Sequence, residues 1–413
     1  MKRKKQYQFP KNRIFVYEFF RSLGKSTFQP GCFVIQCAVD LYARFVGVHP
    51  GKVVKQMTAS EKLVQLLKLQ PNEAVAVHNP SNMFYLTEGY SGEGVVFISA
   101  ARRVIVTDFR YTEQAEKQAP GFEVAMTERG MSHSQWIARL CKEGGIDTLY
   151  YEDDTLTVKQ FEAFKAVQAE DTVYRALNQS PEKLREVKTE AEGIAIEKAC
   201  AITSKAFDLI LPKIVEGVTE KELQIELEFA MLRLGADGMA FSTIIASGEN
   251  GSLPHAIPSD RKIRKGDMIT MDYGAKVGGY CSDMTRTVAF GEPSAEMRRV
   301  YETVLAAQQM AQDALAPGKK CSDIDKIARD YIDNQGYKGR FGHGLGHGVG
   351  IDIHENPRLS MMCDDIVEVG HVLTVEPGIY LPGIGGVRIE NTCLVVEGGC
   401  KALTTAPKEL LIL

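Results

Sequence analysis

The sequence lacks two features that would indicate a membrane or nucleic acid as a partner. No apolar run approaches the roughly 18 residues that a membrane-spanning helix requires. Charge of one sign is not in large excess, since 49 basic residues stand against 53 acidic ones and the net charge is -4. We therefore expect no membrane and no nucleic acid as a partner. With 44% hydrophobic and 25% charged residues, the composition is typical of a folded globular protein.

Signals for export and for paired cysteines are also missing. None of the nine cysteines forms a CxxC pair, and scattered cysteines of this kind are typical of a reducing compartment. A secretory signal needs an unbroken apolar segment, but FVIQCAVDLYARFVGV is interrupted by Gln36, Asp40 and Arg44. We therefore expect a cytoplasmic protein.

The chain divides by pattern into an extension and two domains. Residues 1–56 are poorly periodic and begin with a basic stretch, and we interpret them as an N-terminal extension, which an upstream gene start would explain. Strand-like AVAVH, GVVFISA and TLYYE alternate with helical TEQAEKQA and SHSQWIARLCKEGG, which predicts an α/β domain over 57–184. Capping boxes at Thr189 with Glu192 and at Thr219 with Glu222 open long helices in an α+β domain over 185–413.

Two acids lie in a segment with the composition of a β-hairpin, MDYGAKVGGYCSDMTRTVAF. With the hairpin centred between Val277 and Gly278, Asp272 and Asp283 become direct cross-strand neighbours. Two carboxylates in these positions repel each other, so a shared proton, a basic neighbour or a cation has to compensate. The alternative is that each acid points to solvent from the polar face of its strand.

A second acid pair has the same arrangement in TVEPGIYLPGIGGVRIENTCLVV. A hairpin centred on Gly383 places Glu376 opposite Glu390. If the two hairpins pack together, four carboxylates gather in one place, and they cannot all remain ionised in a partly buried site without cations. Oxygen ligands of this kind suit divalent manganese, cobalt, zinc or magnesium.

Four of the eight histidines add to this pattern. His343, His347 and His354 lie in FGHGLGHGVGIDIHENP, whose alternating glycines disfavour a helix and allow close backbone approach, and His255 lies in SLPHAIPSD. A neutral imidazole favours manganese, cobalt or zinc over magnesium. We expect His343 to lie near the site, without assigning it a role.

These motifs resemble those of the pita-bread metallopeptidases, in the branch of aminopeptidase P and prolidase. The matching features are Asp272 and Asp283 eleven residues apart, HGLGHGVGIDIHE, VEPGIY at Glu376, and GVRIE ending in Glu390. NPSNMFYLTEGYSG and VTDFRYTEQA are similar to the creatinase/prolidase N-terminal domain, so the resemblance covers about 57–413. It implies an α/β N-terminal domain followed by an α+β pita-bread catalytic domain.

The resemblance also implies which residues act. Two divalent metal ions, with manganese favoured and cobalt or zinc as alternatives, would be bound by Asp272, Asp283, His347, Glu376 and Glu390. A hydroxide bridging the ions would be the nucleophile, with Glu376 taking the proton of the water. By the same resemblance, His255 and His354 would contact the substrate and polarise its carbonyl. Arg388 is two residues from Glu390 and so on the same strand face, where it would lie beside the substrate and hold the carboxylates in place.

The presence of the N-terminal domain points to cleavage of the Xaa-Pro bond at the amino end of short peptides that carry proline at the second position. Aminopeptidase P and Xaa-Pro dipeptidase activities both fit the ligand set, and relatives often form a homodimer. Two alternatives are a metal-free creatinase-type C–N hydrolase and a non-catalytic pita-bread binding protein. Relatives of both kinds have generally lost the ligand positions that are intact here.

Overall fold

The computed structural model describes residues 57–413. The predicted extension over 1–56 lies outside the described residues. In the first part of the described region the helices and strands are, in chain order, α3 (Ala59–Leu67), β1 (Glu73–Val77), α4 (Pro80–Thr87), β2 (Val95–Ser99), β3 (Arg103–Thr107), α5 (Thr112–Gln118), β4 (Glu123–Met126), α6 (His133–Gly144), β5 (Thr148–Tyr151), α7 (Val158–Lys165), β6 (Val173–Ala176) and α8 (Ser180–Glu186).

These elements build a mixed sheet of six strands in the order β4-β3-β2-β1-β5-β6. Strands β1 to β3 form an antiparallel meander, whereas β4, β5 and β6 join through helical crossovers as parallel neighbours. The predicted α/β pattern is confirmed. Helices α3 and α4 were not predicted, although Asn79 caps the first turn of α4 and Pro80 begins it, which are ordinary helix-start signals.

The second part is built from α9 (Glu190–Ile210), η1 (Leu211–Lys213), α10 (Glu220–Arg233), β7 (Gly238–Met239), β8 (Ile244–Ser247), η2 (Gly248–Ser252), β9 (Asp267–Tyr273), β10 (Ala275–Val277), β11 (Tyr280–Cys281), β12 (Met284–Phe290), α11 (Ala295–Ala314), α12 (Cys321–Ile332), η3 (Asp333–Tyr337), β13 (Gly346–Gly348), β14 (Glu355–Leu359), β15 (Val372–Val375), β16 (Gly378–Leu381), β17 (Gly385–Arg388), β18 (Asn391–Val396) and β19 (Gly399–Ala402). Both predicted capping boxes are formed, at the starts of α9 and α10.

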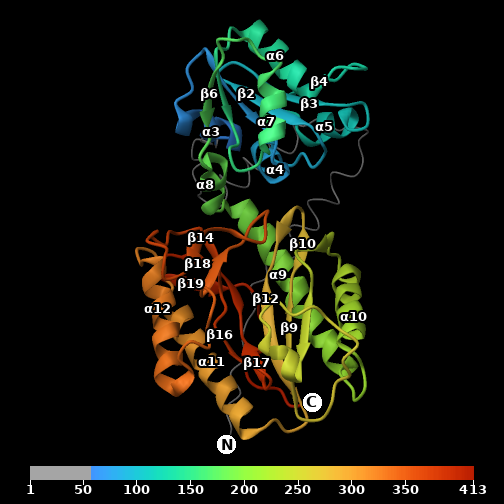
Figure 1. Ribbon diagram of the computed structural model, residues 1–413, viewed down its shortest axis with the longest axis vertical. Coiled ribbons are helices and arrows are strands. Elements are labelled where there is room, and N and C mark those ends of the chain that lie inside the picture. Colours follow the sequence, from blue (N-terminus) through green and yellow to red (C-terminus); the bar gives the residue numbers. More distant parts are fainter. Residues whose placement is uncertain (1–56) are drawn as a thin grey trace, which may run out of the picture. The chain divides into compact units, whose positions relative to one another are not determined.

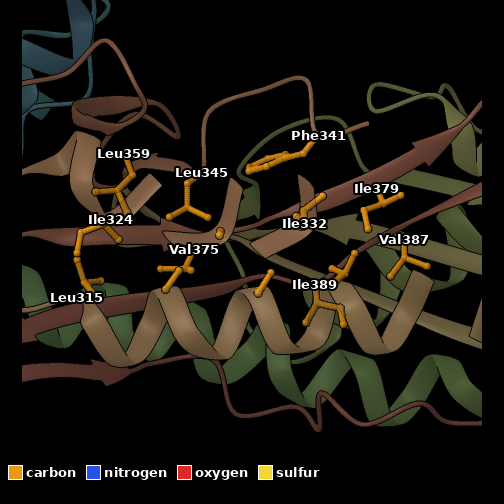
Figure 2. Close-up of a cluster of buried hydrophobic side chains, with 14 of the residues drawn as sticks. Leu315, Ile324, Ile332, Phe341, Leu345, Leu359, Val375, Ile379, Val387 and Ile389 are labelled. Atoms are coloured by element: carbon orange, nitrogen blue, oxygen red, sulfur yellow. The ribbon is translucent and has the colours of Figure 1, made fainter. Parts of the chain in front are cut away.

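Antiparallel sheets carry the second part, with β12-β9-β8 in one and β14-β13-β15-β18-β19 in another. Helices α11 and α12 lie to one side of these strands and α10 to the other (Figure 1). Helix α11 turns an apolar face inward at Val300, Val304 and Ala311, and this face packs on Val375, Val387 and other strand residues in one core cluster (Figure 2). The buried apolar faces fix the strands rigidly, so side chains on their other faces have defined positions.

Candidate metal centre

The first predicted acid pair lies on a hairpin whose turn is one residue further along than predicted. Gly278 and Gly279 both have positive φ, at 56° and 86°, and form a two-residue turn that pairs Val277 with Tyr280. The predicted direct pairing of Asp272 with Asp283 is therefore wrong, since Asp272 pairs with Thr285. Side chains two residues apart point to the same face, so Asp283 still lies on the face of Asp272, as a diagonal neighbour.

The second hairpin has the predicted register. Gly378 pairs with Arg388 and Val375 pairs with Asn391, so two ladders share the register that a hairpin centred on Gly383 requires. Glu376 and Glu390 lie in the short gap between these ladders. Their backbone N–H groups leave the hairpin, and that of Glu390 donates to Thr285 O at 3.1 Å. This bond joins the second hairpin to the strand that begins next to Asp283.

The glycines around His347 allow the backbones of neighbouring strands to approach closely. A Cβ on Gly346 would lie 2.0 Å from Thr374 O, and one on Gly348 would lie 2.4 Å from Asn356 O, so neither position accepts a side chain. The predicted absence of a helix is confirmed, because Gly346–Gly348 form β13. His347 Nδ1 donates to Gly348 O at 3.0 Å, which leaves the Nε2 lone pair facing the carboxylates, as a metal ligand requires.

The structure brings four of the five candidate ligands into one cluster and places the fifth at its edge. Ligand atoms of Asp283, His347 and Glu390 all lie within 4.8 Å of one another. His347 Nε2 is 3.5 Å from Asp283 Oδ2 and 3.3 Å from Glu376 Oε1. Asp272 lines the same cavity, with its Oδ2 accepting from Arg388 Nη2 at 2.6 Å.

The electrostatics of this cluster fit a cation. Burial, together with the negative charges of Glu390 and Asp272, raises the pKa of Asp283 well above its usual range. Burial and the charge of Glu376 do the same for Glu390. Asp272 Oδ1, Asp283 Oδ1 and Glu390 Oε1 are buried without a hydrogen-bond partner among the described residues. Three unpartnered carboxylate oxygens beside an imidazole lone pair form a donor set for a divalent metal ion.

A buried polar chain supports the cluster; it contains Arg388 and His343, as expected, together with Tyr380 and Thr285, which sequence reasoning missed. Arg388 donates from Nη1 to the hydroxyl of Tyr380 at 2.9 Å and from Nε to the hydroxyl of Thr285 at 3.1 Å. The Tyr380 hydroxyl lies 2.9 Å from His343 Nε2, which places His343 near the site as expected. The Tyr380 position in VEPGIY, four residues after Glu376, is the one sequence signal that could have indicated it.

A cavity of about 720 Å³ opens in front of the cluster. His255 and His354 line it, together with Arg388 and Arg358. Burial, with His347 and Arg358 nearby, lowers the pKa of His354 to about 4, so its ring is neutral near pH 7. The arrangement therefore combines a cation-binding acid cluster, imidazole N–H donors and a cavity large enough for a short peptide.

Comparison of the sequence with known protein families identifies both parts of the chain. Residues 194–397 match metallopeptidase family M24, and residues 60–187 match the creatinase/prolidase N-terminal domain. The chain belongs to metallopeptidase family M24. It has the pita-bread catalytic fold preceded by a creatinase N-terminal domain, it is a metallo-exopeptidase, and its chemistry uses divalent metal ions.

Members of the M24 family with similar sequence and structure align over nearly their whole length. A Xaa-Pro dipeptidase of Pyrococcus furiosus is 37% identical over 85% of this chain and 99% of its own. The structure of a Xaa-Pro dipeptidase from Bacillus anthracis has a TM-score of 0.82 at 40% identity, covering 86% and 99%. An X-Pro aminopeptidase from Thermotoga maritima has a TM-score of 0.79 at 34% identity, covering 85% and 100%. Within residues 57–413, no helix of this M24 peptidase is long and apolar enough to cross a bilayer.

Proposed function

We propose that this M24 peptidase hydrolyses the Xaa-Pro bond at the amino end of short peptides, with two divalent ions bound by Asp272, Asp283, His347, Glu376 and Glu390. The observation that carries the proposal is the set of three unpartnered, buried carboxylate oxygens around the free Nε2 of His347. Four carboxylates carry more negative charge than one divalent ion balances in a buried site, which favours two ions. Mixed oxygen and imidazole donors favour manganese, with cobalt or zinc as alternatives.

When bound, the ions would supply Lewis acidity and a water of lowered pKa. Side chains of the protein would transfer the proton, polarise the scissile carbonyl and hold the ligands in place. Glu376 Oε1 accepts from the Thr374 hydroxyl at 3.0 Å, which leaves Oε2 to take the proton of the attacking water. His255 and His354 would donate N–H groups to the oxygen of the scissile carbonyl as it gains charge. The guanidinium of Arg388 lines the cavity and donates to Asp272 and Tyr380, so it would hold both side chains in place beside the substrate.

We further propose that the preferred substrate is a dipeptide. Arg358 lines the cavity and is the direct cross-strand neighbour of His347 between β13 and β14. Within residues 57–413 no carboxylate forms an ion pair with it, so its guanidinium is free to bind an anion. The carboxylate of a two-residue substrate ends close to the scissile bond, where such a cation would bind it. The similarity to proteins named Xaa-Pro dipeptidase supports this assignment. The similarity to the X-Pro aminopeptidase from Thermotoga maritima supports the alternative, an aminopeptidase.

The experiment that tests the function compares Xaa-Pro, Xaa-Pro-Xaa and Xaa-Ala peptides in added manganese, with Asp283→Ala as the inactive control. We expect Xaa-Pro to be cleaved with the highest kcat/KM and the variant to cleave none of the three peptides. Higher kcat/KM for Xaa-Pro-Xaa would replace the dipeptidase assignment by an aminopeptidase one. Equal cleavage by wild type and variant would refute the site.

The role of Arg358 predicts a loss that depends on substrate length. Arg358→Met is expected to lower kcat/KM for Xaa-Pro roughly 10- to 100-fold, because a hydrogen-bonded charge pair contributes about 1.5–3 kcal/mol. For Xaa-Pro-Xaa, whose carboxylate ends one residue further away, the loss should be small. Arg358→Lys is the matched control and should keep part of the activity. A similar loss of kcat/KM on both peptides would show that Arg358 does not bind the substrate carboxylate.

Two structural features of the protein are also proposals. We place the boundary between the domains at residues 184–185, within α8, so that Arg185 and Lys188 belong with the catalytic domain. We propose a homodimer, which sedimentation of the full chain would test.

A further inference from the structure

The loop from Gly350 to Glu355 follows the strand of His347 and carries His354, two residues of the proposed site. It leaves β13 next to His347, carries His354, and returns to the sheet where Glu355 pairs with Gly348. The His354 ring packs edge-on against His347, with ring centroids 4.5 Å apart, and has no hydrogen-bond partner among residues 57–413. The position of this ring in the cavity therefore depends on the backbone of the loop.

The two ends of the loop are held differently. At its start, Gly350 O accepts from the backbone N–H of Cys281 on β11 at 2.7 Å. At its end, the Glu355 carboxylate folds back over the loop, and its Oε1 accepts from the backbone N–H of Asp352 at 3.1 Å. A Cβ on Gly350 would lie 2.3 Å from Glu355 Oε2, so the loop can pack this closely only because residue 350 is glycine.

Two cations from a distant part of the chain hold the same carboxylate. Lys188 Nζ donates to Glu355 Oε2 at 2.8 Å, and Arg185 Nη2 donates to Glu355 Oε1. Arg185 Nη2 also donates to Asp352 Oδ2 at 2.6 Å, so both acids of the loop are bound to it. Arg185, Lys188 and Glu355 are 3%, 8% and 8% exposed. The two cations balance the charges of Asp352 and Glu355 in a buried cluster.

The cluster continues into the creatinase-type N-terminal part of the chain. Arg185 Nη1 donates to Asn82 Oδ1 at 2.8 Å, and Asn82 Nδ2 donates to Glu152 Oε1 at 2.8 Å. The hydroxyl of Ser81 donates to Asp352 Oδ1 at 2.6 Å. Helix α4, which carries Ser81 and Asn82, is thus bonded to the loop that carries His354, both directly and through Arg185.

The energetics of buried ion pairs indicate what such a cluster does. The cost of desolvating the charges offsets much of their attraction, so a buried pair is weak evidence for a net gain in stability. Its bonds are directional, however, and they fix the carboxylate to one place. Burial alone would raise the pKa of Glu355, but Lys188 and Arg185 outweigh it and lower that pKa, so the acid is ionised at neutral pH.

We propose that Arg185, Lys188 and Glu355 are positioning residues that fix the 350–355 loop, so that His354 projects into the active-site cavity. The proposal rests on the proposed contact of His354 with the substrate. It assigns the N-terminal domain a task in catalysis, because Ser81 and Asn82 on α4 bind the loop and the Arg185 side chain that holds it. A displacement of about 1 Å in a substrate-contacting group can lower the rate about 100-fold.

The test compares a variant with an unbalanced buried charge with one in which the charge is balanced again. The comparison distinguishes a role in positioning His354 from a role in the stability of the protein. Glu355→Gln keeps the shape of the side chain but leaves one buried positive charge unbalanced. The double variant Glu355→Gln/Lys188→Met removes that excess, so its melting temperature should return toward wild type. Since both ion pairs of Glu355 are absent and only the bonds to Asp352 remain, its kcat on Xaa-Pro in manganese should stay about 10- to 100-fold low, with bound metal per chain unchanged. Glu197→Gln, which breaks the exposed 2.6 Å pair with Lys401, is the matched control and should behave as wild type.

A measurement by NMR, which does not depend on activity, distinguishes failure of the positioning role from failure of the proposed peptidase function. In protein with isotope-labelled histidine, the His354 ring resonance, assigned with His354→Gln, should shift in both Glu355 variants and stay unchanged in the control. Recovery of kcat together with melting temperature in the double variant, or an unshifted His354 resonance, would overturn the positioning role. If wild type cleaves no Xaa-Pro peptide but the resonance shifts, the proposed function fails and the positioning of His354 is retained.

Discussion

Asp283→Asn is expected to abolish turnover of this M24 peptidase without destabilising its metal-free form. The amide cannot replace the carboxylate as a ligand for a divalent ion, so several kcal/mol of transition-state stabilisation are lost and kcat should fall by about 10³-fold or more. Without metal, burial and the neighbouring acids disfavour the ionised form of Asp283, as its raised pKa shows, so the neutral amide removes no stabilising charge. The metal-free variant should therefore melt at the same temperature as metal-free wild type or higher.

The measurements are kcat on a Xaa-Pro peptide, bound metal per chain, and thermal melting with and without chelator. Asp171→Asn, at an exposed position, is the matched control and should leave all three values unchanged. An Asp283→Asn protein that binds the full complement of metal and turns over at the wild-type rate would remove Asp283 from the site. A large loss of stability in the metal-free variant would instead indicate a structural role.

Removing the metal with a chelator is expected to stop turnover and to lower the melting temperature. A ligand that binds only the native state at 100 times its Kd contributes about 2.7 kcal/mol, which corresponds to a shift on the order of 5 °C in a domain of this size. Manganese should restore both turnover and melting temperature. Equal melting temperatures of the loaded and the chelated protein would contradict binding at a cluster of buried, mutually repelling acids.

The size of this shift should depend on pH in a defined direction. In the metal-free protein, burial and neighbouring acids hold the pKa values of Asp283 and Glu390 above those of the unfolded chain. The native state therefore binds more protons than the unfolded state, and the stability of the chelated protein falls as the pH rises through the raised pKa values. The loss of melting temperature on chelation should be larger at pH 8 than at pH 6. Asp283→Asn, which lacks one of the two groups, should show a weaker dependence.

Local features of the sequence predicted the helices and one hairpin well. The capping boxes at Thr189 and Thr219 involve residues three apart, so their geometry is contained in a few residues and does not depend on the rest of the fold. The hairpin centred on Gly383 was predicted in its observed register for the same reason. The missed helices α3 and α4 also begin with local signals, a capping box at Thr58 and Asn79 before Pro80.

In the first hairpin, an error of one residue in the predicted turn position changed the predicted cross-strand pairs. Centring the turn between Gly278 and Gly279, where both residues have positive φ, pairs Asp272 with Thr285 instead of Asp283. Because side chains alternate between faces with a period of two, a shift of the turn centre by one residue changes the partner of Asp272 but not the face of either acid. The expectation that both acids share a face is confirmed, although the direct contact between them was wrong.

By itself, the sequence determined the class of the fold, most helix starts, one hairpin register, and the residue types of an acid and histidine cluster. Only the tertiary structure decided which oxygens lack partners, that Arg388 binds Asp272 across 116 positions, and that Arg185 and Lys188 bind Glu355 from more than 160 positions away. The physical reason is range: caps and turns are set by bonds between near neighbours in the chain. Desolvation and ion pairing depend on which distant segments the packed core brings together.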